Sequence, residues 1–192
     1  TYLERLKNGE GRNARAPMMA AAKRVRSIVA ELLEEVAGTV RPWESPAHAN
    51  AVVRIAQELR AAAGVVHGQA SDLVLRAARL EAEWQGVLLA KSLPVQFDFA
   101  RVPEAQLAAL VRRPVDGKPL ADWTDGIAQF GLGGVKEALN RGLTRGAPVG
   151  EIAAEIRSVL DVSTRAAETI TRTAVTHASS GARQEFAEQN AD

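Results

Sequence analysis

Residues 45–92 read SPAHANAVVRIAQELRAAAGVVHGQASDLVLRAARLEAEWQGVLLAKS. Apolar side chains recur every three or four residues along this stretch, which is the period of one face of an α-helix. Ser45 can cap the first free N–H groups, and Pro46 suits the first helical turn. No firm stop follows, so the stretch predicts one helix about 70 Å long at 1.5 Å per residue. Gly64 and Gly68 are where a bend is expected.

A helix of this length needs more cover than one small domain core provides. Residues 14–36 also have helical spacing, and Gly38 stands where a C-cap glycine is expected. Two arrangements therefore remain open: residues 14–37 pack back along the long helix as an antiparallel arm, or another subunit covers it. Residues 1–13 are polar and contain two glycines, so we expect a flexible arm there.

Beyond the long helix the pattern changes twice. Residues 94–100 alternate apolar and polar side chains, which predicts a short extended segment with Val95, Phe97 and Phe99 facing one way. A short helix near 103–112 and a turn rich in proline and glycine are expected next.

Helical spacing resumes at Leu120 and runs toward the end of the chain. The glycines at 131, 133 and 134 interrupt this helical spacing. They indicate either a helix break or a site of close packing. An amphipathic helix is predicted over 149–160, and Ser163 is the expected N-cap of a last helix ending near Gln189.

The fold class that follows is mainly α, with at most one short extended or β segment near 94–100. We expect an elongated helical hairpin or long-helix arm followed by a small C-terminal helical domain. The expected divisions are a flexible basic arm (1–13), an elongated helical arm (14–92), a connector (93–119) and a helical core (120–192).

The last predicted helix carries small side chains at strict i+4 spacing, which suits close packing against another helix. This face, together with two residues of the long helix, is the candidate packing interface: Ala166, Ile170, Ala174, Ala178, Ala182, Phe186, Trp84 and Leu88. The three tryptophans, Trp43, Trp84 and Trp123, are expected to be packing anchors. An exposed tryptophan would instead indicate a contact with a partner.

The net charge is +1, yet residues 1–30 carry seven basic residues against two acids. A basic segment can contact phosphate or an acidic protein surface, although a solvated face is the simpler interpretation. On the last helix three arginines at spacings of 7 and 11 share one side. The candidate partner or phosphate contacts are Arg12, Arg15, Lys23, Arg24, Arg26, Arg165, Arg172 and Arg183.

No pattern in the chain points to catalysis. The absence of cysteine excludes disulfides and thiolate metal sites, and the three histidines lack metal-ligand spacing. His177 is expected to be partly buried, and five glutamates on helical segments are expected to be exposed: Glu31, Glu34, Glu35, Glu81 and Glu83. We expect no enzyme activity, cofactor or metal, and no membrane anchor, since no apolar run approaches about 20 residues.

The run from Leu120 to Asn190 resembles the core of the phage Mu protein F-like minor head protein family. In that family a helix ending in two spaced glycines precedes a short amphipathic helix and then a helix with an arginine-threonine pair. The matching residues are Gly142, Gly146, Ile152, Ile156, Arg172 and Thr173. The family commonly has an acid after the arginine-threonine pair, whereas Ala174 stands here.

This resemblance implies a minor structural protein of a tailed-phage head that docks on the portal protein or the major capsid protein during assembly. It would lie in the virion, inside the head near the portal vertex, after assembly in the host cytoplasm. Homo-oligomers and contact with double-stranded DNA are further expectations. Two alternatives are a nucleic-acid-binding helical module that uses the basic residues above, and the helical carrier region of a longer toxin.

Overall fold

The computed structural model describes residues 2–93 and 98–191, and this part of the chain is mainly helical with no β-strand. The predicted fold class is therefore confirmed as all-α. The helices, in chain order, are α1 (Tyr2–Asn13), α2 (Arg15–Glu35), the 3-10 turn η1 (Pro42–Glu44), α3 (Pro46–Ser92), α4 (Glu104–Leu110), α5 (Leu120–Arg145) and α6 (Val149–Gln189).

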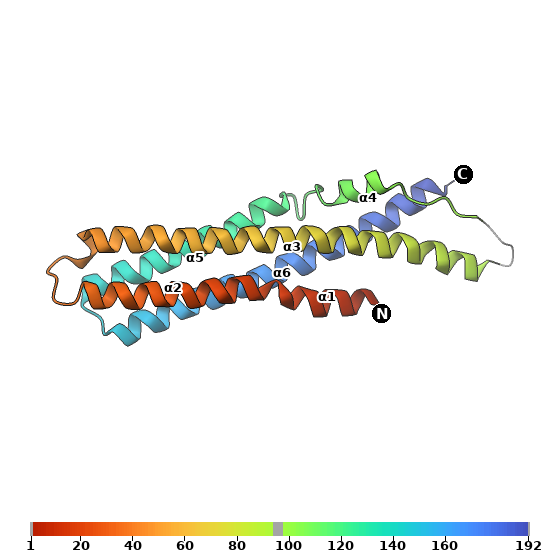
Figure 1. The fold of residues 1–192 in the computed structure, drawn as a ribbon. Helices are drawn as coiled ribbons and strands as arrows, with labels where there is room; N and C mark the ends of the chain where they lie inside the picture. The colour runs from red at the N-terminus through yellow and green to blue at the C-terminus, as the bar shows by residue number, and fades with distance from the viewer. Residues whose placement is uncertain (1, 94–97, 192) are drawn as a thin grey trace.

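Four long helices form an elongated bundle whose central pair is α3 and α6 (Figure 1). Both central helices contact α2 and α5, whereas α2 and α5 do not contact each other in the described residues. Successive helices run in opposite directions, because short connections join α2 to α3 and α5 to α6. Of the two arrangements left open by the sequence, the antiparallel arm is the one observed: α2 lies along α3.

The helix boundaries of α2 and α3 follow local chemistry. The Ser45 hydroxyl accepts a hydrogen bond from the His48 N–H at 3.1 Å, as the capping prediction required. Gly38, just after the end of α2, has a φ of +80°, a conformation that disfavours any side chain. Neither Gly64 nor Gly68 breaks α3, because both lie on exposed positions and the helix around them is held by packing.

Where a flexible arm was expected at residues 1–13, Tyr2–Asn13 forms the helix α1. Leu6 is buried against Leu73, Ala77 and Val175, so α1 packs on both central helices. Tertiary packing thus outweighs the helix-destabilising effect of glycine, which costs about 1 kcal/mol per residue relative to alanine.

The glycines of α5 do not interrupt the helix; three of them allow close packing instead. A Cβ on Gly131 would lie 3.0 Å from the Ser163 hydroxyl, and one on Gly134 would lie 2.6 Å from Cγ1 of Val159. Gly142 similarly contacts Ile152. Glycine at these positions lets the α5 backbone approach α6 more closely than any side chain would permit.

The two helices predicted at 149–160 and after Ser163 are one continuous helix, so Ser163 is not a cap. Its hydroxyl donates to the Val159 carbonyl four residues earlier, at 3.3 Å. Other serine and threonine hydroxyls of α6 do the same: Thr164, Thr169, Thr171, Thr173, Thr176 and Ser179. The buried hydroxyls are therefore satisfied within their own helix rather than by a neighbour.

The predicted division between 14–92 and 120–192 does not correspond to separate cores, because one hydrophobic cluster contains side chains from α2, α3, α5 and α6. Of the predicted extended segment at 94–100, residues 94–97, with Val95 and Phe97, lie outside the described residues. The short helix near 103–112 is present as α4. In the following turn Asp116 and Gly117 have φ values of 49° and 80°, and Val115 pairs with Lys118 across it.

Two adjacent glycines of α5 allow a matched test of the close packing. Gly134→Ala should destabilise the protein by about 1–3 kcal/mol, because the new methyl group overlaps Val159. Gly133→Ala meets no atom within 4 Å and should stabilise it by roughly 0.5–1 kcal/mol through helix propensity. Urea unfolding followed by circular dichroism measures both changes; equal shifts in the two variants would contradict the close approach.

Candidate docking surfaces

The C-terminal end of α3 leaves the bundle core. Buried positions on α3 end at Ala82, and beyond it the side chains of Trp84, Val87 and Leu88 are 56%, 46% and 44% exposed. Leu89 and Leu93 are exposed as well. In Figure 1 this yellow-green end of α3 extends past the N-terminus of α1. We call residues 84–93 the α3 tip.

The α3 tip is apolar on more than one side. At 100° per residue, Trp84, Val87 and Leu88 share one side with Lys91, whereas Leu89 and Leu93 fall on the opposite side. A helix that is packed on one side only has a polar opposite side. Apolar side chains on two opposite sides of a helix are typical of a segment that becomes buried, so the α3 tip is a candidate contact surface.

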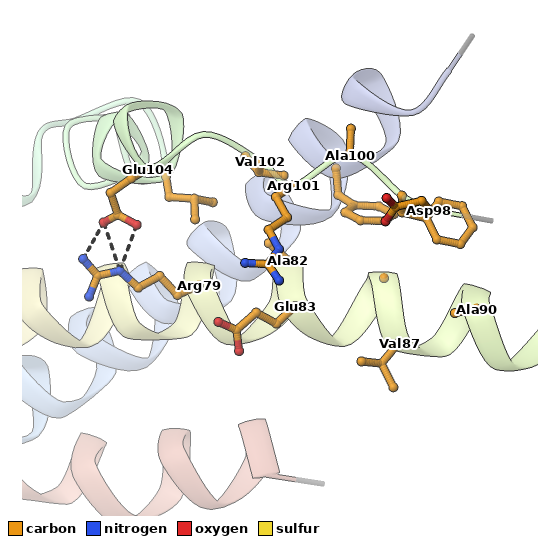
Figure 2. Close-up of a pocket in the computed structure, with 14 residues that line it drawn as sticks. Arg79, Ala82, Glu83, Val87, Ala90, Asp98, Ala100, Arg101, Val102 and Glu104 are labelled. Atoms are coloured by element: carbon orange, nitrogen blue, oxygen red, sulfur yellow. Dashed lines mark hydrogen bonds and ion pairs between the residues drawn. The ribbon is translucent and has the colours of Figure 1, made fainter. Parts of the chain in front are cut away.

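A groove of about 650 Å³ lies beside the tip, between α3 and the segment 98–104 (Figure 2). At one end the Arg79 Nε donates to Glu104 Oε1 at 3.0 Å, and this hydrogen bond holds the pKa of the Glu104 carboxyl below its ordinary value. Arg101 extends across the groove toward α3. The groove thus combines an apolar floor with charged walls.

The C-terminal end of α6 fastens the segment that borders this groove. The Asn190 side-chain oxygen accepts a hydrogen bond from the Ala100 N–H at 2.7 Å, and its amide nitrogen donates to the Ala100 carbonyl at 3.1 Å. The ring centroids of Phe99 and Phe186 lie 6.0 Å apart. One amide therefore pairs with both backbone groups of Ala100, as a neighbouring strand would.

The predicted packing interface divides into two parts. On α6, Ile170, Ala174, Ala178, Ala182 and Phe186 are buried in this chain's own bundle, and Ala166 is partly buried against it. The face is therefore not available to another molecule.

The long-helix members of that interface behave differently, since Trp84 and Leu88 are exposed. Trp43 and Trp123 are half-buried, as packing anchors would be, and the Trp123 indole N–H donates to the Val115 carbonyl at 2.8 Å. His177, expected to be partly buried, is exposed, with Nε2 3.1 Å from Asp116 Oδ1.

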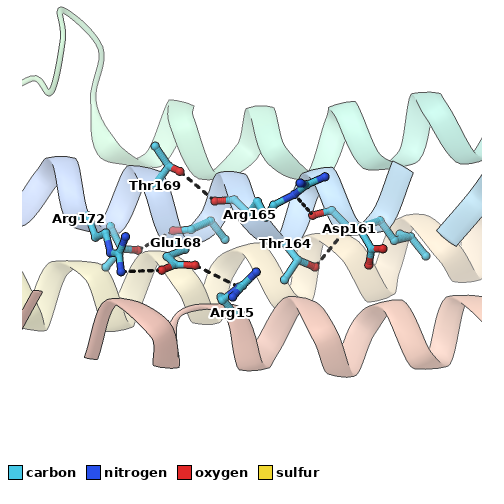
Figure 3. A network of polar contacts seen from close by, with 10 residues as sticks. Arg15, Asp161, Thr164, Arg165, Glu168, Thr169 and Arg172 are labelled. Carbon is cyan, nitrogen blue, oxygen red and sulfur yellow. Dashed lines mark hydrogen bonds and ion pairs between the residues drawn. The ribbon is translucent and has the colours of Figure 1, made fainter. Parts of the chain in front are cut away.

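Figure 3 shows two of the three predicted contact arginines on α6, Arg165 and Arg172, and only Arg172 lies at the contact between Glu168 and Arg15 of α2. Glu168 binds Arg172 at 2.9 Å and Arg15 at 3.1 Å, so one carboxylate is shared by two guanidinium groups. Arg165 is exposed and its Nε donates to the Asp161 carbonyl at 3.4 Å.

Arg183 does not belong with these two arginines, because its Nε donates to Glu81 on α3. The Glu81 side chain is only 1% exposed, which makes the prediction of an exposed glutamate wrong at this position. Gln85 also donates to the same carboxylate oxygen, at 2.8 Å. The hydrogen bond that Arg183 donates to Glu81, together with the negative charge of Glu81, raises the pKa of Arg183 above its ordinary value.

The sequence contained a signal for this buried pair. Glu81 falls four residues after Ala77 and three after Ala78, on the apolar stripe that faces the core. Its position in the stripe, rather than its charge, predicts its burial.

The basic residues of the N-terminal region differ in their partners. Arg15 and Arg24 are paired, with Glu168 and Glu58 respectively. Arg12, Lys23 and Arg26 are exposed and have no carboxylate partner in the part of the chain that the structure describes.

The fold and these surfaces define an elongated all-α bundle with an apolar tip. Comparison with models of known protein families, with curated proteins and with solved structures gave no match. Within residues 2–93 and 98–191, no three potential ligand side chains are grouped to hold a metal ion. No helix there has the length and apolar character needed to cross a membrane.

The buried carboxylate gives a test of how α3 and α6 are held together. Arg183→Ala should destabilise the protein by about 2 kcal/mol, because Glu81 then stays buried without its cation. The double variant Arg183→Ala/Glu81→Leu should recover most of this loss, since a leucine needs no charged partner. Urea unfolding measures both variants.

Arg141→Ala is the control, because Arg141 pairs with Glu137 and Glu155 at the surface and should change stability by less than about 1 kcal/mol. Similar losses in the Arg141→Ala and Arg183→Ala variants would mean that Glu81 is accessible to water.

Proposed function

We propose that this protein is a helical docking protein of a tailed-phage head, and that it inserts the α3 tip into an apolar groove of the portal protein or the major capsid protein. The exposed apolar side chains of residues 84–93 are the observation that carries the docking role. The resemblance of Leu120–Asn190 to minor head proteins supports the identity of the partner. The proposed location is the inside of the head near the portal vertex.

The tip has the composition of a helix that binds in a groove. Such helices present a few large apolar anchors at i, i+3, i+4 and i+7 spacing. Trp84, Val87 and Leu88 match the first three positions, and Lys91 follows at the fourth. Each large anchor that buries its remaining exposed half would contribute about 1 kcal/mol through the hydrophobic effect alone.

The bundle prepares the tip for this contact. Residues 46–82 of α3 are packed against α2, α5 and α6, so the helical backbone leading into the tip is already ordered before a partner arrives. Binding by an ordered segment avoids most of the conformational entropy that a disordered segment would lose. A long helix anchored at one end and apolar at the other suits a protein that joins larger subunits.

The test is co-purification of the chain with a portal protein and a major capsid protein from the same genome, followed by affinity measurement. Trp84→Ala/Leu88→Ala should weaken binding by roughly 30-fold or more, as loss of a central anchor costs at least about 2 kcal/mol. The control is Val53→Ala/Val65→Ala, which removes exposed apolar side chains from α3 outside the tip and should leave the affinity unchanged. Circular dichroism should be the same for both variants.

Each failure has a distinct meaning. Absence of binding by the unaltered chain to either subunit would reject the phage-head assignment. Binding that both double variants retain would reject the α3 tip as the contact surface. Self-association that depends on Trp84 and Leu88, seen by sedimentation, would assign the tip to a second copy and contradict docking on the portal or capsid.

A further inference from the structure

The end of α1 and the greater part of α2 carry basic residues and no acidic ones. Between residues 11 and 30 the chain has five basic residues and no acid. Arg15 and Arg24 are neutralised by Glu168 and Glu58, which leaves Arg12, Lys23 and Arg26 without carboxylate partners in the described residues. The positive charge is thus concentrated on one segment of a protein whose net charge is only +1.

The free cations of α2 point away from its buried side. Met18, Ala21 and Val25 mark the face that packs into the bundle. At 100° per residue Lys23 lies nearly opposite that face, and Arg26 lies to one side of it. Both side chains are exposed.

Arg26 meets another free arginine from α6. A hollow of about 170 Å³ between α2 and α6 is lined by Arg26 and Arg157, with Met19 and Asp161 beside them. Arg157 is exposed and, like Arg26, has no ion pair within the described ranges. Two guanidinium groups from different helices therefore border one small depression, although they are more than a hundred residues apart in sequence.

The outer side of α6 extends the positive surface. Arg165 is exposed, and the carboxylate of Glu168 is shared by Arg172 and Arg15 (Figure 3). We define the α2/α6 basic face as Arg12, Arg15, Lys23, Arg26, Arg157, Arg165 and Arg172. On α6, Asp161 lines the hollow and Glu168 pairs with Arg15 and Arg172.

We propose that the α2/α6 basic face binds the phosphate backbone of double-stranded DNA. Contacts with phosphates require cations and hydrogen-bond donors but no sequence-specific groups. From Arg15 to Arg26 the cations extend about 17 Å along α2 at 1.5 Å per residue, long enough to meet several phosphates of a duplex. A phosphate at the hollow would have Arg26 and Arg157 beside it.

The composition of the face favours duplex DNA over two other partners. Single-stranded nucleic acid is usually held by aromatic side chains on which bases stack, and no aromatic residue occurs between residues 11 and 42 or between 131 and 185. A specific protein interface normally has an apolar centre. The exposed large apolar side chains on α2 and the outer side of α6 are confined to Met19 and Val162 in the described residues.

This inference is independent of the proposed portal docking, because the α2/α6 basic face and the α3 tip lie on different helices. The test is fluorescence anisotropy with a labelled duplex of about 30 base pairs over a range of salt concentrations. The affinity should fall steeply as salt rises, since binding releases counterions from the phosphates. Lys23→Gln/Arg26→Gln/Arg157→Gln should weaken binding at least tenfold at low salt and reduce the slope of log K against log salt by roughly 3.

A matched control distinguishes the effect of this face on DNA affinity from the effect of the total charge of the protein. Arg60→Gln/Arg112→Gln/Arg145→Gln removes the same charge from exposed positions outside the face and should leave affinity and slope close to those of the unaltered chain. Equal losses in the two triple variants, or no binding to the duplex at about 50 mM salt, would overturn the proposal. Tighter binding to a single strand, or displacement of the duplex by polyglutamate at equal charge concentration, would also overturn it.

Discussion

Close contact between helix backbones, which only small side chains permit, is the constraint on which the bundle depends. Where α5 meets α6, Gly131, Gly134 and Gly142 accept side chains of α6 directly against the backbone. Alanines form much of the buried surface of α3 and α6. Small residues bury little apolar area each, so stability must come from many contacts along long helices rather than from a wide core. The elongated shape follows from this composition.

Unequal helix lengths explain why the C-terminal end of α3 is not covered by the other long helices. Four helices cover one another only over the length that they share, and α3, with 47 residues, is longer than α2, with 21, or α5, with 26. Its excess length lies at the C-terminal end, where the sequence continues with tryptophan, valine and leucine instead of changing to polar residues. In the rest of α3, exposed valines occur singly, as on most protein surfaces. Length mismatch and composition together produce the α3 tip.

Helical periodicity was sufficient to predict the all-α class, the full extent of α3 with its Ser45 cap, and α4. It overestimated the effect of glycine, because Gly9 and the glycines of α5 lie within helices that tertiary contacts stabilise. Which apolar face another element covers depends on the three-dimensional arrangement. The alanine face of α6 does pack against other helices, but within this chain's own bundle, and Trp84, expected to be a packing anchor, is exposed. The meeting of Arg26 with Arg157 likewise depends on tertiary packing, which periodicity along one helix does not encode.

The hydroxyl groups that α6 satisfies within its own backbone have a consequence for helix alignment. Three buried hydroxyls of α6 donate to carbonyls of their own helix: Ser163, Thr164 and Thr171. These hydroxyls therefore do not fix the axial position of a neighbouring helix against α6. A repeat of alanines every four residues would look nearly the same after a slip of one turn. The pairing of Arg183 on α6 with Glu81 on α3 can form at only one alignment. It therefore fixes the axial position of α6 against α3.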